Sequence, residues 1–271
     1  MNSLTGNSVL AVLALIAVDA GAFSYEPWVS VRPKVPVLPA NQLKFYLHFR
    51  EPMARGEVFR YIRLVEIDKS AQEVAEVPEP FREVELWDET FTRMTLWLHP
   101  GRQKPGVNLN VDIGPILEEG KRYRLEISPE WDFEDGKGLT GEDRNTERFD
   151  FYAGPTDDAQ PDPSGWTVER ESERAIKVLT GECIDSVSAE KRITFYDESG
   201  KVVVPNFFSS NSEYLFVSRQ LWESGKYRME VDPALEDVAG NSVARPFNLD
   251  IVKYPDFMER TEPVVVEFVL P

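Results

Sequence analysis

Hydrophobic and polar residues alternate with a period of two along much of this chain. Residues 43–49 place leucine and phenylalanine on one side of an extended segment and lysine, tyrosine and histidine on the other. The same alternation recurs at residues 95–98, 123–127, 192–196, 214–217 and 227–231. Clusters of proline and glycine separate these segments, and alternation bounded by such clusters is typical of β-strands. Amphipathic helices are scarce, residues 70–77 being a weak candidate, so the pattern predicts an all-β sandwich.

Two stretches of the first half recur in the second. Residues 122–139 align without a gap on residues 226–243, and residues 45–53 align on residues 176–184. The first pair is offset by 104 residues and the second by 131, so the first unit carries about 27 extra residues in its middle. Units about 100 residues long have the size of an Ig-like sandwich.

A linker is predicted between these units at residues 154–165, which contain three prolines and three aspartates. Such a composition favours a stiff, extended and solvated segment. The predicted organisation is therefore a signal peptide, an Ig-like domain with a long inserted loop, the linker, and a second Ig-like domain, over residues 1–22, 23–153, 154–165 and 166–271.

The signal peptide is predicted from ten apolar residues, 9–18, and the small residues Ala20-Gly21-Ala22 that follow them. The apolar run is too short to cross a bilayer as a helix, which takes about 20 residues. A buried apolar helix is the alternative. The chain has a single cysteine, whereas small secreted eukaryotic domains more often carry disulfides. The expected location is therefore bacterial, and secreted, periplasmic or on the cell surface. No transmembrane segment is expected in the mature protein.

Four short motifs carry a resemblance to a known family. They read FREPM at 49–53, LEEGKRY at 117–123, LWESGKY at 221–227 and DVAGN at 237–241. They resemble the F-S-x-P-M opening, the L-x-x-G-x-Y strand and the D-x-x-G-N turn of bacterial Ig-like domains of the S-layer type. Cys183-Ile184 replaces the Pro-Met pair in the second unit, and Lys137-Gly138 replaces Gly-Asn in the first. The resemblance implies a tandem pair of exported binding, adhesion or spacer modules of the bacterial envelope, without catalysis.

Charge and composition restrict the function further. The 271 residues include 30 Lys and Arg against 47 Asp and Glu, a formal net charge of −17, so nucleic acid is not expected as a partner. One cysteine and two histidines, His48 and His99, exclude a disulfide framework and zinc sites built from several Cys or His. Cys183 is expected to be a small buried residue and His48 to face solvent. No P-loop, nucleophile elbow or zinc-protease motif is present, so an enzyme is not expected.

The candidate binding residues lie in and beside a long connection that begins at His99 and contains two Pro-Gly pairs. Trp97, His99, Arg102 and Lys104 could bind an acidic or hydroxyl-bearing ligand, such as a cell-wall glycan or an envelope protein, by stacking and hydrogen bonds. The alternatives are a self-packed loop whose polar groups cap its own turns, and a carbohydrate- or peptide-active site in residues 99–114.

No cofactor is expected, with calcium as the one exception left open. Asp157, Asp158 and Asp162 of the linker are weak calcium candidates, because calcium prefers clustered oxygen ligands. Solvated turns are the alternative for these aspartates. For Asp237, a turn in which the carboxylate accepts local backbone N–H bonds is the expected role.

Overall fold

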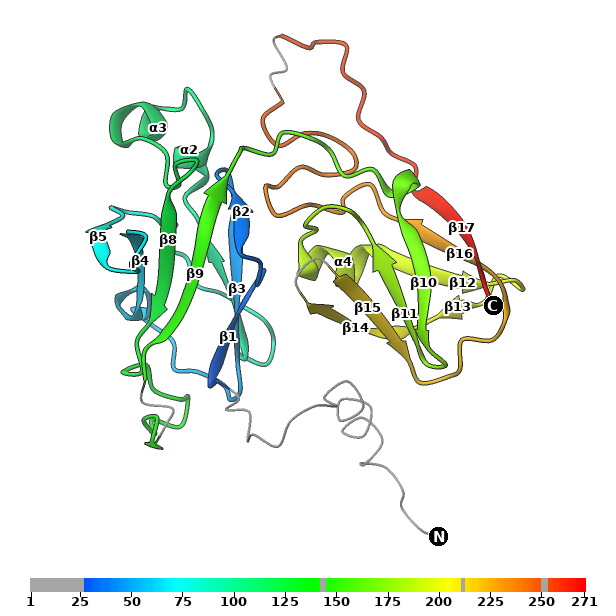
Figure 1. Ribbon diagram of the computed structural model, residues 1–271, viewed down its shortest axis with the longest axis horizontal. Coiled ribbons are helices and arrows are strands. Elements are labelled where there is room, and N and C mark those ends of the chain that lie inside the picture. Colours follow the sequence, from blue (N-terminus) through cyan, green and yellow to red (C-terminus); the bar gives the residue numbers. More distant parts are fainter. Residues whose placement is uncertain (1–26, 142–144, 211–212, 250–252) are drawn as a thin grey trace.

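The computed structural model describes residues 27–141, 145–210, 213–249 and 253–271. The signal peptide predicted over residues 1–22 lies outside these ranges. Figure 1 shows two groups of strands side by side, β1 to β9 in the first unit and β10 to β17 in the second.

The first unit is a sandwich of two sheets. One sheet has the order β1-β3-β7-β6, formed by Val29–Arg32, Lys44–Phe49, Arg93–Trp97 and Leu86–Trp87. The other has the order β2-β9-β8-β4-β5, formed by Val37–Pro39, Glu147–Gly154, Arg122–Ile127, Ile62–Ile67 and Glu73–Glu76. All neighbours are antiparallel except β2 and β9. Short helices are η1, α2 and α3, at Val58–Tyr61, Pro100–Gln103 and Asn108–Ile113.

The second unit repeats this plan. One sheet has the order β10-β11-β15-β14, formed by Thr167–Ser172, Ala175–Leu179, Glu213–Ser218 and Pro205–Ser210. The other has the order β13-β12-β16-β17, formed by Val202–Val203, Ile193–Asp197, Gly225–Val231 and Val264–Leu270. The helices are η3 (Pro163–Gly165) and α4 (Ser186–Arg192).

Each unit has its own hydrophobic core, where the apolar faces of its two sheets meet. In the first, the rings of Phe45 and Phe151 lie 5.6 Å apart, and in the second Phe195 and Phe216 lie 4.8 Å apart. Among the described residues the two clusters of buried side chains share no member. The predicted all-β sandwich fold is confirmed; the domain boundaries of the sequence analysis stay predictions.

The pairing registers of the two units coincide. Arg122 faces Tyr152 across β8 and β9, and Lys226 faces Val269 across β16 and β17. Arg122 and Lys226 are the first residues of the aligned stretches, and every later pair along these strands keeps the same correspondence. The same holds for the neighbouring strands. Ile62 of β4 faces Ile127 of β8, and Ile193 of β12, 131 residues after Ile62, faces Val231 of β16.

The extra residues of the first unit lie in two connections. Residues 77–85 join β5 to β6, where Val204 alone joins β13 to β14 in the second unit. Residues 98–121 join β7 to β8 and contain α2 and α3, where residues 219–224 suffice between β15 and β16. The first unit therefore differs from the second mainly at one side of its sandwich.

Two local expectations were wrong. Residues 73–76 of the weak helix candidate form strand β5, because Asp68 makes a tight turn by accepting hydrogen bonds from the backbone N–H groups of Ser70 and Gln72 at 2.8 and 2.9 Å. His48 does not face open solvent, since its side chain is half-buried and its Nε2 atom is fully buried.

A polar contact joins the two units. The hydroxyl of Tyr46 in β3 donates to the carboxylate of Asp185, the N-cap of α4, at 2.6 Å. Lys44, two residues earlier on the same face of β3, lies 2.5 Å from Glu236 and 3.8 Å from Asp185. Asp185 is only 3% exposed, so these partners take the place of water around its carboxylate.

The connection between the units is bonded from both sides. The side-chain amides of Asn41 and Asn241 donate to the backbone carbonyl of Asp157 at 2.8 and 2.9 Å. Asn241 also donates to Asp237, whose other carboxylate oxygen accepts the N–H groups of Ala239 and Asn241 at 2.8 and 2.9 Å. The turn expected at Asp237 is thus confirmed, and burial raises the pKa of this carboxyl to about 7.

Candidate functional site

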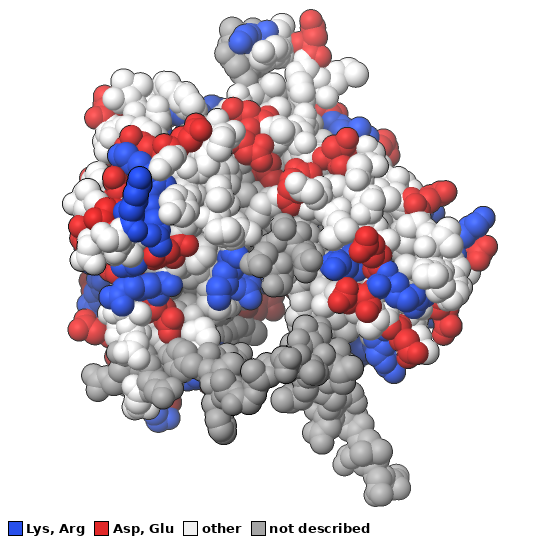
Figure 2. Space-filling view, in the orientation of Figure 1, with Lys and Arg blue, Asp and Glu red and all other residues white. Residues whose placement is uncertain are grey.

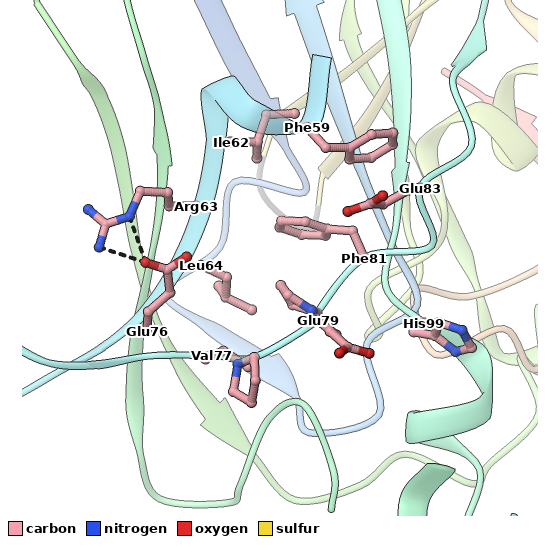
Figure 3. A pocket seen from close by; sticks show the side chains of 12 residues that line it. Phe59, Ile62, Arg63, Leu64, Glu76, Val77, Glu79, Phe81, Glu83 and His99 are labelled. Carbon is pink, nitrogen blue, oxygen red and sulfur yellow. Dashed lines mark hydrogen bonds and ion pairs between the residues drawn. The ribbon is translucent and has the colours of Figure 1, made fainter. Parts of the chain in front are cut away.

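A pocket of about 700 Å³ opens on the side of the first unit where the two long connections lie. Its floor is the start of β4, its far wall is the segment 76–83, and His99 closes one end. Figure 3 shows these side chains around the opening. The pocket therefore combines residues of the strand frame that both units share with residues of the two long connections.

The apolar part of the pocket is a pair of phenyl rings. Phe59 of η1 and Phe81 of the connection between β5 and β6 lie with ring centroids 6.5 Å apart, above Ile62 and Leu64 of β4. Phe81 is held in place because its backbone forms a β-bridge with Leu98 at the end of β7. The rings thus belong to a braced segment rather than to a free loop.

The polar part of the pocket is acidic. Arg63 and Glu76 neutralise each other at 3.0 Å at one end of the opening (Figure 3). Glu79 and Glu83 are exposed, and within the described part of the chain neither carboxylate forms a hydrogen bond or ion pair. Glu79 has a left-handed backbone, with φ of 42°, between Pro78 and Pro80. Such strain is kept only where surrounding contacts impose it.

Arg102 imposes that conformation from inside the fold. It is 2% exposed, and its guanidinium donates to the backbone carbonyls of Gly114 and Pro115 at 2.9 and 2.8 Å. It also donates to the carbonyls of Pro78 and Glu79, in the other connection. Desolvation lowers the pKa of Arg102 against a smaller opposite effect of the Glu79 charge, and the carbonyl dipoles also compensate the guanidinium charge. Arg102 supports the pocket from behind, as the self-packed alternative for this loop implies.

His99 lines the pocket directly. Its Nδ1 atom accepts the backbone N–H of Gly101 at 3.2 Å and so caps α2. With Nδ1 engaged as an acceptor, a neutral ring carries its proton on Nε2, which is left as a donor for a ligand.

The other two candidate residues lie outside the pocket lining. Trp97 stands on the outer face of β7, with the guanidinium of Arg82 5.2 Å from its ring centroid. Lys104 is the C-cap of α2. The structure thus places His99 at the pocket and Arg102 behind it, and does not bring Trp97 or Lys104 to it. Sequence reasoning missed Phe59, Phe81, Glu79 and Glu83, which belong to no motif.

The linker aspartates make local hydrogen bonds. Asp157 and Asp162 accept backbone N–H groups of residues two positions later, Ala159 and Ser164, both at 3.1 Å. Asp158 accepts from the side chain of Asn248 at 3.3 Å. In the described ranges no three His, Cys, Asp or Glu side chains are arranged to hold a metal ion.

The thiol of Cys183 is half-buried, and burial raises its pKa to about 11. A thiol in that state is poorly nucleophilic at neutral pH.

Where basic residues of the first unit cluster, neighbouring carboxylates form ion pairs with them. In Figure 2 basic and acidic side chains are interleaved over the face of this unit. On the outer face of β8 and β9, Arg124 lies 2.6 Å and Arg122 3.0 Å from Asp150, and Arg148 lies 3.0 Å from Glu126. This face offers no concentration of free positive charge to attract a phosphate backbone.

Comparisons with known proteins assign this chain to no family. No family model and no curated protein matches the chain. A segment of native alpha-2-macroglobulin from Escherichia coli is 11% identical with a TM-score of 0.26, and the alignment covers 75% of this chain and 64% of that one. A two-domain fibronectin type-III segment of chicken tenascin is 14% identical with a TM-score of 0.22, over 90% and 98%. The N-terminal Ig1-2 module of the Drosophila receptor protein tyrosine phosphatase DLAR is 12% identical with a TM-score of 0.21, over 91% and 100%.

These likenesses are too weak to carry an argument about function, so the site must be interpreted from its own chemistry. Within the described ranges, no helix has both the length and the apolar character needed to cross a membrane.

Proposed function

We propose that the protein is a non-catalytic binding module whose acidic pocket binds a basic, extended peptide segment of another envelope protein. The observation that carries this proposal is the convergence of both extra connections of the first unit on one pocket, with two uncommitted carboxylates beside two phenyl rings. Extra loops on a shared strand frame are where binding residues concentrate.

The chemistry of the pocket favours a lysine or arginine side chain. Glu79 and Glu83 can form charge-assisted hydrogen bonds with an ammonium or guanidinium group, and the partly exposed ring of Phe59, backed by buried Phe81, can attract a cation through its face. A neutral sugar would leave both carboxylates without a counter-charge. A net charge of −17 also steers basic partners towards the protein.

Export to the bacterial envelope is part of this proposal. Its support is the apolar run with the Ala20-Gly21-Ala22 site and the resemblance to S-layer-type domains. A binding role without catalysis agrees with the absence of a catalytic motif in the sequence.

Fluorescence anisotropy with a labelled Lys-Val-Lys-Val-Lys-Val peptide tests the proposal. We expect saturable binding that weakens with salt, and a loss of about tenfold or more in the variant Glu79→Gln/Glu83→Gln, because each charge-assisted bond contributes about 1.5–3 kcal/mol. The matched control is Glu119→Gln/Glu198→Gln, which removes the same charge at two exposed positions away from the pocket.

An equal loss in the pocket variant and the control would show that only net charge matters. Absence of saturable binding up to about 1 mM peptide, or equal affinity for the neutral peptide Gln-Val-Gln-Val-Gln-Val, would also contradict the proposed function.

A further inference from the structure

The second unit has a pocket of its own at the position that corresponds to the acidic pocket. Its volume is about 720 Å³, and its lining includes Ile193, Thr194 and the segment 202–208. At the offset of 131 residues fixed by the registers of β4 and β12, Ile193 takes the place of Ile62 and Glu190 that of Phe59. Both units are thus open on the same side.

The chemistry of this second pocket is different. Where the first unit has Glu76 and Pro78, the second has Val202 and Val204, which are 45% and 79% exposed. Phe208 is a further exposed apolar residue, at 38%. A patch of this kind on a soluble protein marks a contact surface more often than chance.

Strand edges border the pocket on two sides. β13 and β14 are the outermost strands of their sheets, and in the described ranges β14 is hydrogen-bonded on one side only, to β15. Residues 202–210 contain no charged residue, in a chain in which 28% of residues are charged. Edge strands are normally protected from pairing by charge, proline, bulges or covering loops. β14 has a proline, Pro205, only at its first position. An edge that lacks charge is suited to pair with another strand.

Two cations stand at the rim. Lys191 and Arg219 line the pocket, and within the described part of the structure neither side chain forms an ion pair. Among the described lining residues Glu190 alone is acidic, and Arg93 of the first unit engages it at 3.3 Å. The free charge at this pocket is therefore positive, opposite to that of the pocket in the first unit.

We propose that the edge of β14 and its pocket form a second binding site, which takes an extended apolar peptide segment bearing an acidic residue. The partner strand would continue the sheet beyond β14, with its apolar side chains against Val202, Val204 and Phe208 and its carboxylate near Lys191 and Arg219. Main-chain pairing provides affinity in such strand addition, and the pocket and rim provide specificity. A second copy of this chain is disfavoured as the occupant, because two chains of net charge −17 repel each other.

Anisotropy with a labelled Asp-Val-Thr-Val-Thr-Val peptide and the intact protein tests this inference. We expect saturable binding that Val204→Glu weakens by about tenfold or more, while Val111→Glu, at a similarly exposed valine on α3, leaves it unchanged. Lys191→Gln/Arg219→Gln should weaken binding, and Lys34→Gln/Lys69→Gln should not. Glu79→Gln/Glu83→Gln should leave it unchanged, which separates this site from the acidic pocket.

A measurement on the unaltered protein tests the proposal without depending on the folding of a variant. Methylation of alternate backbone nitrogens of the peptide should abolish binding if the segment pairs as a strand. Equal binding of the methylated peptide, equal binding of Lys-Val-Thr-Val-Thr-Val to the variant Glu79→Gln/Glu83→Gln, or an equal loss in Val111→Glu would overturn the proposal. It would also be overturned if light scattering showed a dimer that Val204→Glu converts to monomers, since the edge would then pair with a second copy.

Discussion

Arg102 ties two connections of the first unit together through one buried guanidinium group. Its hydrogen bonds reach carbonyls on both sides, at Pro78 and Glu79 and at Gly114 and Pro115. Because the side chain is 2% exposed, water cannot replace these bonds if they are removed.

We therefore predict that Arg102→Ala lowers the free energy of unfolding by about 2–3 kcal/mol, since several buried carbonyls lose their donor. Urea denaturation measures this change. Lys104→Ala, two residues later, should stay within about 0.5 kcal/mol of the unaltered protein. A loss below that limit in Arg102→Ala would show that the loop does not depend on the guanidinium.

His48 is a second residue whose surroundings strongly change a property of its side chain, here its pKa. It lies on the outer face of β3, and its Nε2 atom has no hydrogen-bond partner among the described residues. Burial and the cations Arg32 and Arg93 lower its pKa to about 4, against a smaller opposite effect of Asp88.

This pKa predicts a pH dependence of stability. The folded state binds the proton of His48 more weakly than the unfolded chain, so the stabilisation is complete above about pH 6.5 and is lost as the pH falls towards 4. Between about pH 6.5 and 4.5 the unaltered protein should lose about 2–3 kcal/mol more than His48→Gln. Urea denaturation at both pH values gives the difference. Parallel losses in the two proteins would mean that His48 is protonated normally in the fold.

At the scale of elements, the turns after β4 and β12 are built in the same way, around an aspartate that accepts backbone hydrogen bonds. Asp68 and Asp197 each accept two backbone N–H groups from the four residues that follow. The left-handed position in the second turn is Gly200, with φ of 82°, whereas in the first it is Ala71, with φ of 62°. A side chain at such a position costs free energy that glycine avoids.

Ala71→Gly should therefore stabilise the protein by about 0.5–1 kcal/mol, and Gly200→Ala should destabilise it by a similar amount. Nothing lies within 4 Å of a Cβ atom placed at Gly200, so the effect there is one of backbone conformation alone. Thermal unfolding of the two variants measures both changes. A shift in the same direction in the two would refute this explanation.

These turns also show what the sequence can and cannot predict. Alternation and turn residues are local signals, so the strands around Phe45, Tyr123 and Tyr227 could be predicted from sequence. Strand β5 could not, because its formation depends on pairing with β4 and all four of its residues are exposed.

The pocket was harder still to predict. Phe59, Phe81 and Glu83 are brought together only by tertiary contacts, and a buried cation such as Arg102 has the same sequence pattern as an exposed one. The long connection at residues 99–115 was the one useful signal, since His99 does line the pocket.

At the scale of the whole molecule, the polar contact between the units should limit their relative movement. It is formed by Tyr46 and Lys44 on one side and Asp185 and Glu236 on the other. The linker is held as well, by the amides of Asn41 and Asn241 on one carbonyl of Asp157.

We predict that Lys44→Met/Tyr46→Phe leaves both units folded but loosens their contact by about 1–3 kcal/mol, because buried Asp185 loses its partners in the first unit. Small-angle X-ray scattering should show a larger radius of gyration, and calorimetry should show two separate transitions. Tyr152→Phe, on the surface of β9, is the control. Unchanged scattering in the double variant would mean that other contacts fix the orientation of the units.

The central claim is that the acidic pocket of the first unit binds a basic peptide, and a nuclear magnetic resonance titration tests it most directly. Addition of Lys-Val-Lys-Val-Lys-Val to ¹⁵N-labelled protein should shift the backbone amide signals of Phe59, Arg63, Phe81, Glu83 and His99, with no comparable shifts along β14. The same shifts should be absent in Glu79→Gln/Glu83→Gln. Shifts spread over the acidic surface of both units, or none at the pocket, would contradict the account.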